Sequence, residues 1–230
     1  MADDVNDESA QEPGAWGQVI AAVAMVAALG LGLWTFGKTS SSDSAQKPAT
    51  CSGGAAEDSS RRISGAQLCE ALNRPDLAAV LGTPGEKAKT ASGSGGSLKL
   101  AGGTEIATPS ARVEFETYTV TLSATYDHLP VAGSAVLLGD GALQKTVLGR
   151  PAVLYSDRTI NISFRLDGSD SNSGPGAPAR ALTVALDAKD RGGSIDVALW
   201  RADGLVPDDS VLLRVAETVL PTVPGWAAGV

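Results

Sequence analysis

The feature that most constrains this chain is an uncharged apolar stretch near its start. Residues 16–37 contain no charged side chain, and Lys38 is the first one after them. As a helix, these 22 residues would span about 33 Å, which matches the roughly 30 Å hydrocarbon core of a bilayer. Tryptophan prefers the membrane interface, and one stands near each end of the stretch. We therefore predict a single-pass transmembrane helix over residues 16–37. The side chains expected to anchor it are Trp16, Val19, Ile20, Leu29, Leu31, Leu33, Trp34 and Phe36.

Two other readings of this stretch fit the sequence less well. A cleaved signal peptide has a basic beginning and a shorter apolar run, whereas the first fifteen residues here carry five acidic side chains and no Lys or Arg. A lipoprotein carries its modified cysteine directly after the apolar run. Cys51 instead lies 14 residues beyond Gly37. The stretch is therefore predicted to be a retained anchor.

Small residues four apart could also bring two such helices together. Ala24, Ala28 and Gly32 share one helix face, and this spacing permits close approach of two transmembrane helices. An alanine-rich stretch produces such spacings freely, so a transmembrane dimer is the weaker interpretation.

Two features of the sequence disagree about the side of the membrane that the domain faces. Lys38, Lys47, Arg61 and Arg62 follow the stretch and no basic residue precedes it, which favours a cytoplasmic domain. Long domains, however, cross membranes largely regardless of charge. A cysteine pair and a Ser/Gly-rich tether suit an extracytoplasmic module. We predict the extracytoplasmic side.

The charge of the chain argues against nucleic acid as a partner. The formal net charge is −8. From Lys38 onward the chain has 18 basic and 21 acidic side chains, the latter being 26 acidic residues less the five near the start. A nucleic-acid binder needs a basic face to neutralise phosphates. We predict no nucleic-acid binding.

The rest of the chain is predicted to form a tether and one α+β domain. Residues 1–15 are an acidic tail, residues 38–62 are too poor in apolar side chains to fold, and residues 63–226 carry the domain. Two short helices open it: Ser64 and Gln67 form a capping-box pair, and Gly82 ends the second helix. A helix over 208–220 closes it, ended by Pro221.

Between these helices the apolar alternation predicts an antiparallel sheet on which the helices pack. Residues 112–125 are predicted to be one strand, with a bulge where the apolar phase switches. Residues 86–97 and 168–179 are predicted to be surface loops, and residues 189–193 a hairpin loop. The other predicted strands are 134–138, 146–155, 159–166, 180–188 and 194–200.

Three stretches resemble secreted and membrane-anchored actinobacterial proteins of unknown function, with a domain similar to PsbP-type α/β sandwich lipoproteins. The stretches are 68–82, with Leu-Cys-Glu-Ala-Leu and Leu-Ala-Ala-Val-Leu-Gly, the glycine turn Val-Leu-Gly-Arg-Pro-Ala at 147–152, and the closing helix before Pro221. The resemblance covers about residues 63–226. It implies a fold and an envelope location, and no reaction. In related lipoproteins the helix cysteine pairs with one in a later strand, and this chain has no later cysteine.

Cys51 and Cys69 are the only cysteines, so one disulfide is the most that the chain permits. It would close a loop of roughly twenty residues and stabilise the fold by about 3 kcal/mol. Two free thiols, one of them packed in the core, is the alternative.

No stretch predicts a catalytic, cofactor or metal site. Residues 139–146 imitate a phosphate-binding loop but carry Gln144 where that motif needs glycine, so a hairpin turn is predicted. Residues 167–174 cluster oxygen ligands without the glutamate that calcium loops require. His128 is the only histidine and is read as a surface turn residue. Glu114 and Glu116 are read as an exposed strand face, and the sequon Asn161-Ile-Ser163 lies in a predicted strand.

The sequence therefore predicts a non-catalytic, membrane-anchored extracytoplasmic module that binds a protein or another envelope component. Two alternatives stay open. One is an envelope hydrolase that uses His128 or the Glu114 and Glu116 pair, and the other is a domain docked at the cytoplasmic face of the membrane.

Overall fold

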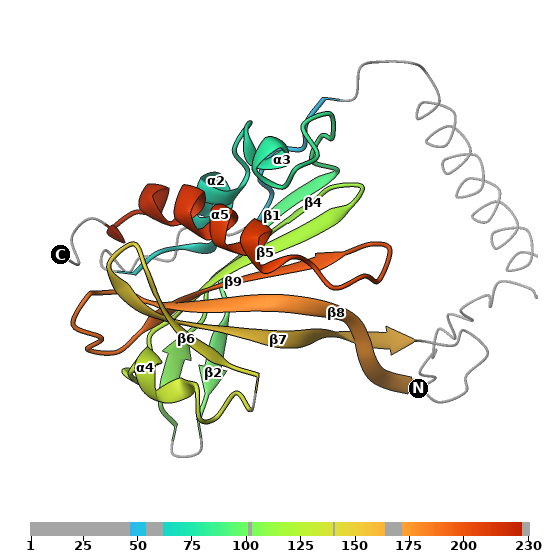
Figure 1. Cartoon of the computed structure of the whole chain (residues 1–230). Coiled ribbons are helices and arrows are strands. Elements are labelled where there is room, and N and C mark those ends of the chain that lie inside the picture. Colours follow the sequence, from blue (N-terminus) through green and yellow to red (C-terminus); the bar gives the residue numbers. More distant parts are fainter. Residues whose placement is uncertain (1–46, 54–61, 101–102, 140, 164–171, 227–230) are drawn as a thin grey trace, which may run out of the picture. The chain divides into compact units, whose positions relative to one another are not determined.

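A seven-stranded antiparallel sheet organises the part of the chain that the structure describes. The computed structural model describes residues 47–53, 62–100, 103–139, 141–163 and 172–226, which belong to one compact unit, residues 47–230. The strand order is β1-β4-β5-β9-β8-β7-β6 (Figure 1). The strands are β1 (Thr90–Ser94), β4 (Ser110–Glu114), β5 (Tyr118–Thr125), β6 (Leu143–Val147), β7 (Arg150–Ser163), β8 (Asn172–Ala185) and β9 (Ser194–Arg201), and β2 (Ser97–Lys99) pairs separately with β3 (Glu105–Ala107).

Helices cover one face of this sheet. Helix α2 (Gly65–Leu72) packs on β1, β4 and β5, and α5 (Asp209–Val219) packs on β8 and β9. The one-turn helix α3 (Leu77–Val80) contacts α5, and the 3₁₀ turn η1 (Leu220–Thr222) follows α5. Helix α4 (Val131–Ser134) contacts β7 and β8 and lies on the opposite side of the sheet from α2 and α5 (Figure 1). The predicted α+β class, with helices packed on an antiparallel sheet, is confirmed at this level.

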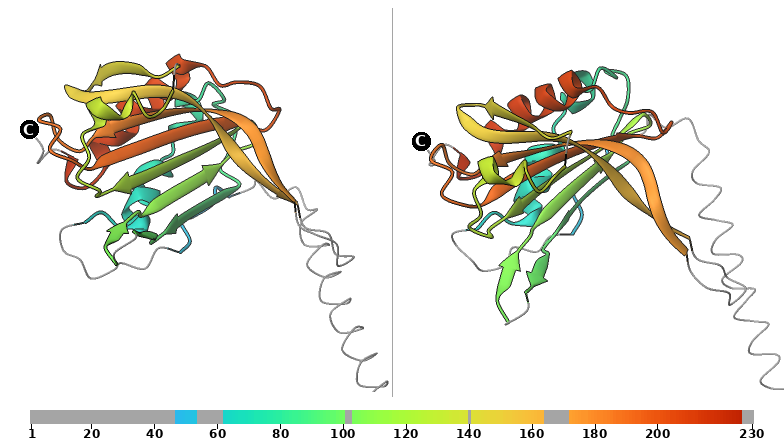
Figure 2. Two further views of the ribbon diagram at one scale, coloured as in Figure 1. Left: turned by 90° about the horizontal axis from the view of Figure 1, so that it is seen from below. Right: turned by 60° about the horizontal axis from the view of Figure 1, so that its bottom comes forward.

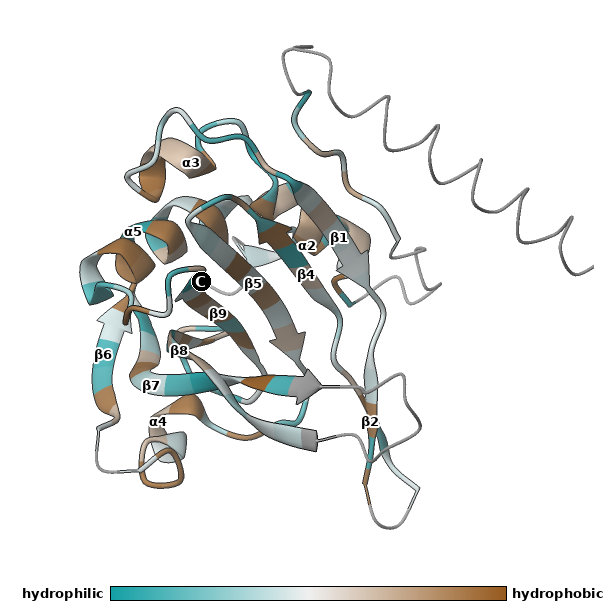
Figure 3. Ribbon diagram, turned by 90° about the vertical axis from the view of Figure 1, so that its right-hand side faces the viewer, coloured by the Kyte–Doolittle hydropathy of each residue, from teal (hydrophilic) through white to brown (hydrophobic). Residues whose placement is uncertain are grey.

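The main core lies between the sheet and the two longer helices. Ile195, Val197 and Leu199 alternate along β9 and are fully buried, as period-two patterning of a half-covered strand requires. Leu68 of α2 and Leu212 of α5 are fully buried in the same cluster. Figure 3 shows the apolar bands of the strands and helices facing one another. Burying each such side chain contributes about 1.5–3 kcal/mol.

The helix ends follow the sequence signals. The Ser64 side chain accepts a hydrogen bond from the Gln67 amide, and the Gln67 side chain accepts one from the Ser64 amide, so the predicted capping box is confirmed. Gly82, with φ +84°, ends the region of α3 as predicted. Asp208 caps α5 through a bond from the Ser210 amide at 2.7 Å, and acidic groups favour the positive end of the helix dipole.

The prediction of one bulged strand over residues 112–125 is wrong. β4 and β5 are two strands of a hairpin, in which Val113 pairs with Val120 and the Phe115 amide donates to the Tyr118 carbonyl at 2.8 Å. Residues that pair across a hairpin share a face. Because only two residues stand between Phe115 and Tyr118, the apolar phase shifts by one position there, and this shift imitates a bulge.

Two further strand predictions are wrong for the same kind of reason. The predicted strand 146–155 is split by a two-residue turn at Leu148 (φ +52°) and Gly149 (φ +77°), which joins β6 to β7. Residues 150–163 then run as one strand with an irregularity between Arg158 and Ile160. The predicted strand 134–138 is the end of α4 and its following turn, because an apolar run of that length fits a short helix equally well.

Two predicted loops carry strand instead. Residues 90–94 of the predicted loop 86–97 form β1, whose alternating burial places Ala91 and Gly93 inward. Residues 172–179 of the predicted loop 168–179 belong to β8, and residues 168–171 lie outside the described residues. Both stretches are rich in Ser, Gly and Ala, which obscures their periodicity. The hairpin loop between β8 and β9 and the strand over 194–200 are confirmed.

A disulfide joins the segment before the domain to its first helix. The sulfur atoms of Cys51 and Cys69 lie 2.05 Å apart, with the cysteines 18 positions apart in sequence, so the predicted pairing is the one that the structure has. Cys69 is fully buried in α2. Next to the bond, Ser52 runs along β1: its amide donates to the Ala91 carbonyl at 3.1 Å, and its carbonyl accepts from the Gly93 amide at 2.9 Å. Residues 47–53, assigned to the tether from sequence, thus cover the edge of β1.

A buried arginine ties the end of the domain to the β6–β7 hairpin. Arg150 is 3% exposed, and its guanidinium donates to the Leu186 and Trp226 carbonyls. The guanidinium also lies 3.5 Å from the centre of the Trp226 ring. Burial lowers the pKa of Arg150, and the charge of Asp187 opposes this effect. These contacts replace the water that the charge loses on folding.

The predicted anchor, its residues from Trp16 to Phe36 and the Ala24, Ala28 and Gly32 face lie outside the described residues. Among the residues that are described, no helix combines the length and the apolar character that crossing a bilayer requires. The anchor and the domain boundaries therefore stay predictions.

Candidate functional site

The face of the sheet opposite α2 and α5, termed the open face, is the candidate functional site. Figure 2 (left) shows this face from below, with α4 in front of one end of it. The strand registers place its side chains in rows: Val153, Thr183, Asp196 and Ser123 in one row, Tyr155, Ala181, Ala198, Thr121 and Arg112 in the next, and Ala179, Trp200, Thr119 and Glu114 in the third. Small and hydroxyl side chains thus separate a few aromatic and charged ones.

A partly buried carboxyl group, that of Asp196, stands in the first of these rows. The Thr183 hydroxyl donates a hydrogen bond to Asp196 Oδ1. Burial raises the pKa of Asp196 to about 6, the Thr183 bond opposes the rise, and the nearby charge of Asp127 adds to it. Burial likewise raises the pKa of Tyr155 to about 12, with a further contribution from Asp196. Asp196, Thr183 and Tyr155 are termed the carboxyl cluster.

An arginine stacked on an indole ring lies on the same face, toward β4 and β5. The Arg112 guanidinium carbon stands 5.0 Å from the centre of the Trp200 ring, within the range of a cation–π interaction. Arg112 is exposed and Trp200 is partly buried. Within the described residues, no carboxylate forms an ion pair with Arg112. The stacked pair can therefore present a cation and an aromatic edge to a ligand.

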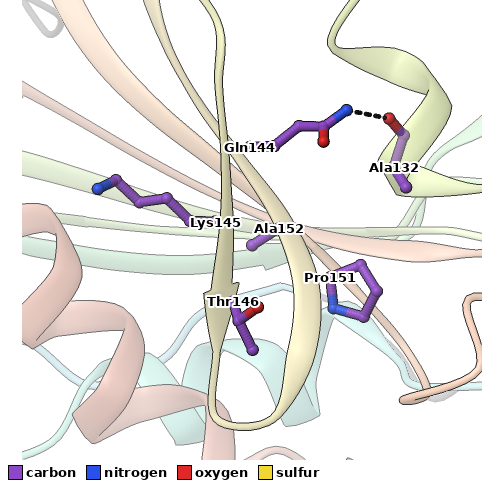
Figure 4. Close-up of a pocket in the computed structure, with 6 residues that line it drawn as sticks. All are labelled: Ala132, Gln144, Lys145, Thr146, Pro151 and Ala152. Carbon is purple, nitrogen blue, oxygen red and sulfur yellow. Dashed lines mark hydrogen bonds between the residues drawn. The ribbon is translucent and has the colours of Figure 1, made fainter.

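A cavity of about 400 Å³ lies where α4 meets the β6–β7 hairpin. Figure 4 shows the residues that line it, with the Gln144 side chain reaching toward α4. The Gln144 amide nitrogen donates to the Ala132 carbonyl at 2.9 Å, which holds α4 against the strand. The lining residues are Ala132, Gln144, Lys145, Thr146, Pro151 and Ala152. Its chemistry is mainly that of backbone and short polar groups.

His128 is an exposed turn residue, as its sequence context predicted. Its backbone has φ +62°, and a Cβ atom added at Gly192 would meet the His128 Cα at 2.3 Å. The turn therefore packs directly on the β8–β9 loop. Among the described residues, no hydrogen bond reaches the imidazole, so the geometry brings together no nucleophile–base pair around it.

Glu114 and Glu116 do not share one strand face, which corrects the sequence reading. Glu114 ends β4 and accepts a hydrogen bond from the Thr90 hydroxyl at 3.3 Å. Glu116 lies in the β4–β5 turn and forms an ion pair with Lys89. The ion pair raises the pKa of Lys89, with smaller contributions from the charges of Glu114 and Glu86. Glu114 and Glu116 thus lie near Lys89, which precedes β1, at the exposed end of the β4–β5 hairpin.

Three motifs of the sequence remain: the phosphate-loop imitation, the possible calcium loop and the glycosylation sequon. Residues 143–146 of the phosphate-loop imitation belong to β6, so the hairpin turn predicted there is wrong for this part. A strand, β7, follows where a phosphate loop has a helix. Most of the possible calcium loop, residues 167–171, lies outside the described residues. Asn161 is exposed in β7. Across the described ranges, no three His, Cys, Asp or Glu side chains are grouped so that they could hold a metal ion.

Sequence reasoning did not single out the carboxyl cluster or the Arg112–Trp200 pair. A signal for one member was available, because Trp200 stands in the phase of β9 that alternates with the buried Ile195, Val197 and Leu199. A large aromatic side chain in the phase expected to face solvent marks a surface worth attention. The approach of Asp196 to Thr183 depends on pairing between strands and leaves no mark in either strand alone.

Comparison with known proteins identifies a family without a known activity. No curated protein and no solved structure matches this chain. A family of unknown function, DUF6215, matches residues 10–141, which include the predicted anchor, the tether and the domain as far as α4. Since the match covers more than half of the 230 residues, the chain belongs to this family of unknown function, DUF6215.

Proposed function

We propose that the protein is a membrane-anchored extracytoplasmic module that binds an envelope component through the open face without catalysing a reaction. The observation that carries the proposal is the asymmetry of the sheet. Helices α2 and α5 cover one face, while the other carries the exposed Arg112 stacked on the partly buried Trp200, and the largely buried carboxyl cluster, among small side chains. The solvated face of an antiparallel sheet is ordinarily polar, so a large indole ring with a guanidinium stacked on it is a feature that a purely structural face does not require.

Two observations support the proposed location. The apolar stretch 16–37 has the length of a membrane span. The Cys51–Cys69 disulfide suits an oxidising compartment, because cytosolic thiols are kept reduced. The resemblance to secreted and membrane-anchored actinobacterial proteins with PsbP-type sandwiches belongs to the same proposal.

The open face has the chemistry of a binding surface. An indole with an exposed guanidinium stacked on it offers apolar contact together with a cation for a carboxylate or phosphate. The hydroxyls of Thr121 and Ser123 stand between this pair and the carboxyl cluster, so they can donate to or accept from a polar ligand. Among the residues that the structure describes, no hydrogen bond joins the exposed His128 to a nucleophile or to a carboxylate, as a hydrolytic triad would require.

Cosedimentation with isolated cell-envelope material tests the proposal. The full chain, in detergent, is mixed with envelope material freed of its own copy of the protein, and the bound fraction is measured for the wild type and for Trp200→Ala and Arg112→Ala. We expect each substitution to lower affinity by roughly tenfold. Arg214→Ala is the matched control, because Arg214 is exposed on α5, away from the open face. Equal binding by all four chains would remove the open face from the account.

A further inference from the structure

The two edge strands of the sheet, β1 and β6, differ in what pairs with their outer sides. On the edge formed by β1, Ser52 pairs with Ser92 as an additional bridge. On the other edge, β6 pairs with β7 alone, and no described strand lies along its outer side. Four of the five β6 side chains are exposed, and only Val147 is buried. The unpaired edge of β6 therefore has its backbone available to another strand.

The turn between β6 and β7 determines which backbone groups point outward. Leu148 and Gly149 both have positive φ, the signature of a two-residue type I′ hairpin turn. The pair that closes such a turn, Val147 and Arg150, exchanges both of its hydrogen bonds, and the pairs then alternate along the ladder. The amide and carbonyl groups of Gln144 and Thr146 therefore face the free side.

An apolar shoulder stands beside this edge. Val136 and Leu137, in the turn that follows α4, are 86% and 84% exposed, and Leu143 at the start of β6 is 52% exposed. Figure 3 shows the apolar turn after α4 near the end of β6. The Gln144 bond to the Ala132 carbonyl links the two elements, and their shared cavity opens between them (Figure 4). Aliphatic side chains so exposed gain little from the fold, and grouped beside an unpaired strand edge they are available for contact with a partner.

Three partners could cover this edge: a bilayer, a second copy of the chain, or a strand of another protein. The charge and the outward backbone groups of the edge distinguish among them. The hydrocarbon core of a bilayer offers no donors or acceptors for the outward groups of Gln144 and Thr146, so burial there would be costly. A second copy pairing symmetrically through β6 would set Lys145 against Lys145, and like charges across a strand pair are destabilising. A strand from a different protein can pair with the backbone, cover the apolar shoulder and meet Lys145 with an acidic side chain.

We propose that the β6 edge and the α4 turn form a strand-addition site for an extended, apolar segment of a partner protein that carries an acidic residue opposite Lys145. In this mode, main-chain hydrogen bonds provide affinity and side chains provide specificity. The site uses none of the carboxyl cluster, Arg112 or Trp200, so it goes beyond the proposed function of the open face.

Fluorescence anisotropy with two labelled peptides tests the proposal on the full chain in detergent. Both probes are short peptides of alternating valine and threonine, one with a central glutamate and the other with a central lysine. We expect the glutamate peptide to bind roughly tenfold more tightly than the lysine peptide, and Lys145→Glu to reverse this preference. Thr146→Pro removes an outward amide while leaving the β7 pairing intact, and should weaken binding roughly fivefold or more. Thr146→Ala keeps the amide and is its matched control.

Each remaining outcome overturns the proposal. Binding of neither peptide would mean that Lys145 protects the edge from pairing. Equal binding of the two peptides would mean that Lys145 does not select the partner's charge. Equal effects of Thr146→Pro and Thr146→Ala would mean that the outward amide of Thr146 does not pair with the peptide. A dimer that Thr146→Pro dissociates in sedimentation would assign the edge to a second copy. Quenching of a dye on Leu137→Cys by spin-labelled lipids in nanodiscs would assign the shoulder to the bilayer. Thermal unfolding of each variant verifies that it folds. The cosedimentation assay with Trp200→Ala tests the open face, and its result is independent of the peptide-binding result.

Discussion

Replacing Asp196 with asparagine should stabilise the domain at neutral pH and leave its stability in mild acid nearly unchanged. Asp196 lies in β9, is partly buried, and accepts a hydrogen bond from the Thr183 hydroxyl. Burial raises its pKa to about 6 from the ordinary value of 3.8. Asparagine has the shape of the neutral acid and can accept the same hydrogen bond. The substitution therefore removes the ionisation while keeping the contact.

The sign of the effect follows from proton linkage. Between pH 3.8 and about 6, the folded chain keeps a proton that the unfolded chain has released, so stability falls as pH rises through this window. The difference between a pKa of 3.8 and one of about 6 corresponds to roughly 3 kcal/mol of unfolding free energy, and this penalty is fully present above the folded-state pKa. As the pH falls through 3.8, the unfolded chain also binds the proton, so the penalty is already small at about pH 4 and disappears below it. The asparagine variant should therefore exceed the wild type by up to about 3 kcal/mol at pH 7.

Urea unfolding of the full chain in detergent, followed by near-ultraviolet circular dichroism at about pH 4 and about pH 7, measures the difference. The other carboxyl groups titrate equally in the variant and in the wild type, so their effect cancels in the difference between the two free energies of unfolding. Thr183→Val is the informative companion, because it removes the donor and should lower stability at both pH values. A stability difference between asparagine variant and wild type that does not change with pH would refute the reasoning.

Three further changes test the packing. Cys51→Ser, Cys69→Ser and the double variant should each lower the free energy of unfolding by about 3 kcal/mol, and additive losses would contradict a shared bond. Arg150→Met should lower the free energy of unfolding in urea by about 2–4 kcal/mol, since one buried and one partly buried carbonyl lose their donor. Arg150→Lys should not restore stability, because lysine lacks the planar fork; recovery with lysine would show that charge alone suffices. Gly192→Ala should lower Tm by several degrees, because φ is +106° and the Cβ would meet the His128 backbone, and an unchanged Tm would mean that this turn moves freely.

Local signals in the sequence predicted the helices better than the strands. The capping box at Ser64 and Gln67, the glycine stop at Gly82 and the amphipathic closing helix all appear where expected. Each depends on residues within one or two turns of one another, so a sequence pattern contains the whole cause.

The strand errors have a common physical origin. A short hairpin turn and a bulge both shift the apolar phase by one residue, so residues 115–118 read alike under either arrangement. At Leu148 and Gly149 the turn is built on a leucine with positive φ, which few sequence rules anticipate. The stretch 134–138 is too short for periodicity to separate strand from helix.

The candidate site was largely invisible before the strands were paired. Asp196 and Thr183 are neighbours only because β8 and β9 are in register, and Arg112 reaches Trp200 across β5. The disulfide was accessible from sequence because the chain has only two cysteines. Pairwise contacts between distant strands need the register, which no single strand encodes.

The location of the domain relative to the membrane is the measurement that bears most directly on the account. A reporter enzyme that is active only outside the cytoplasm is fused after Val230, and a second reporter that is active only inside is fused at the same position in a parallel strain. The account predicts activity from the outside reporter alone, with the fusion protein retained in the membrane fraction after a carbonate wash. Activity from the inside reporter alone, or release of the chain from the membrane by the wash, would contradict the membrane-anchored extracytoplasmic module.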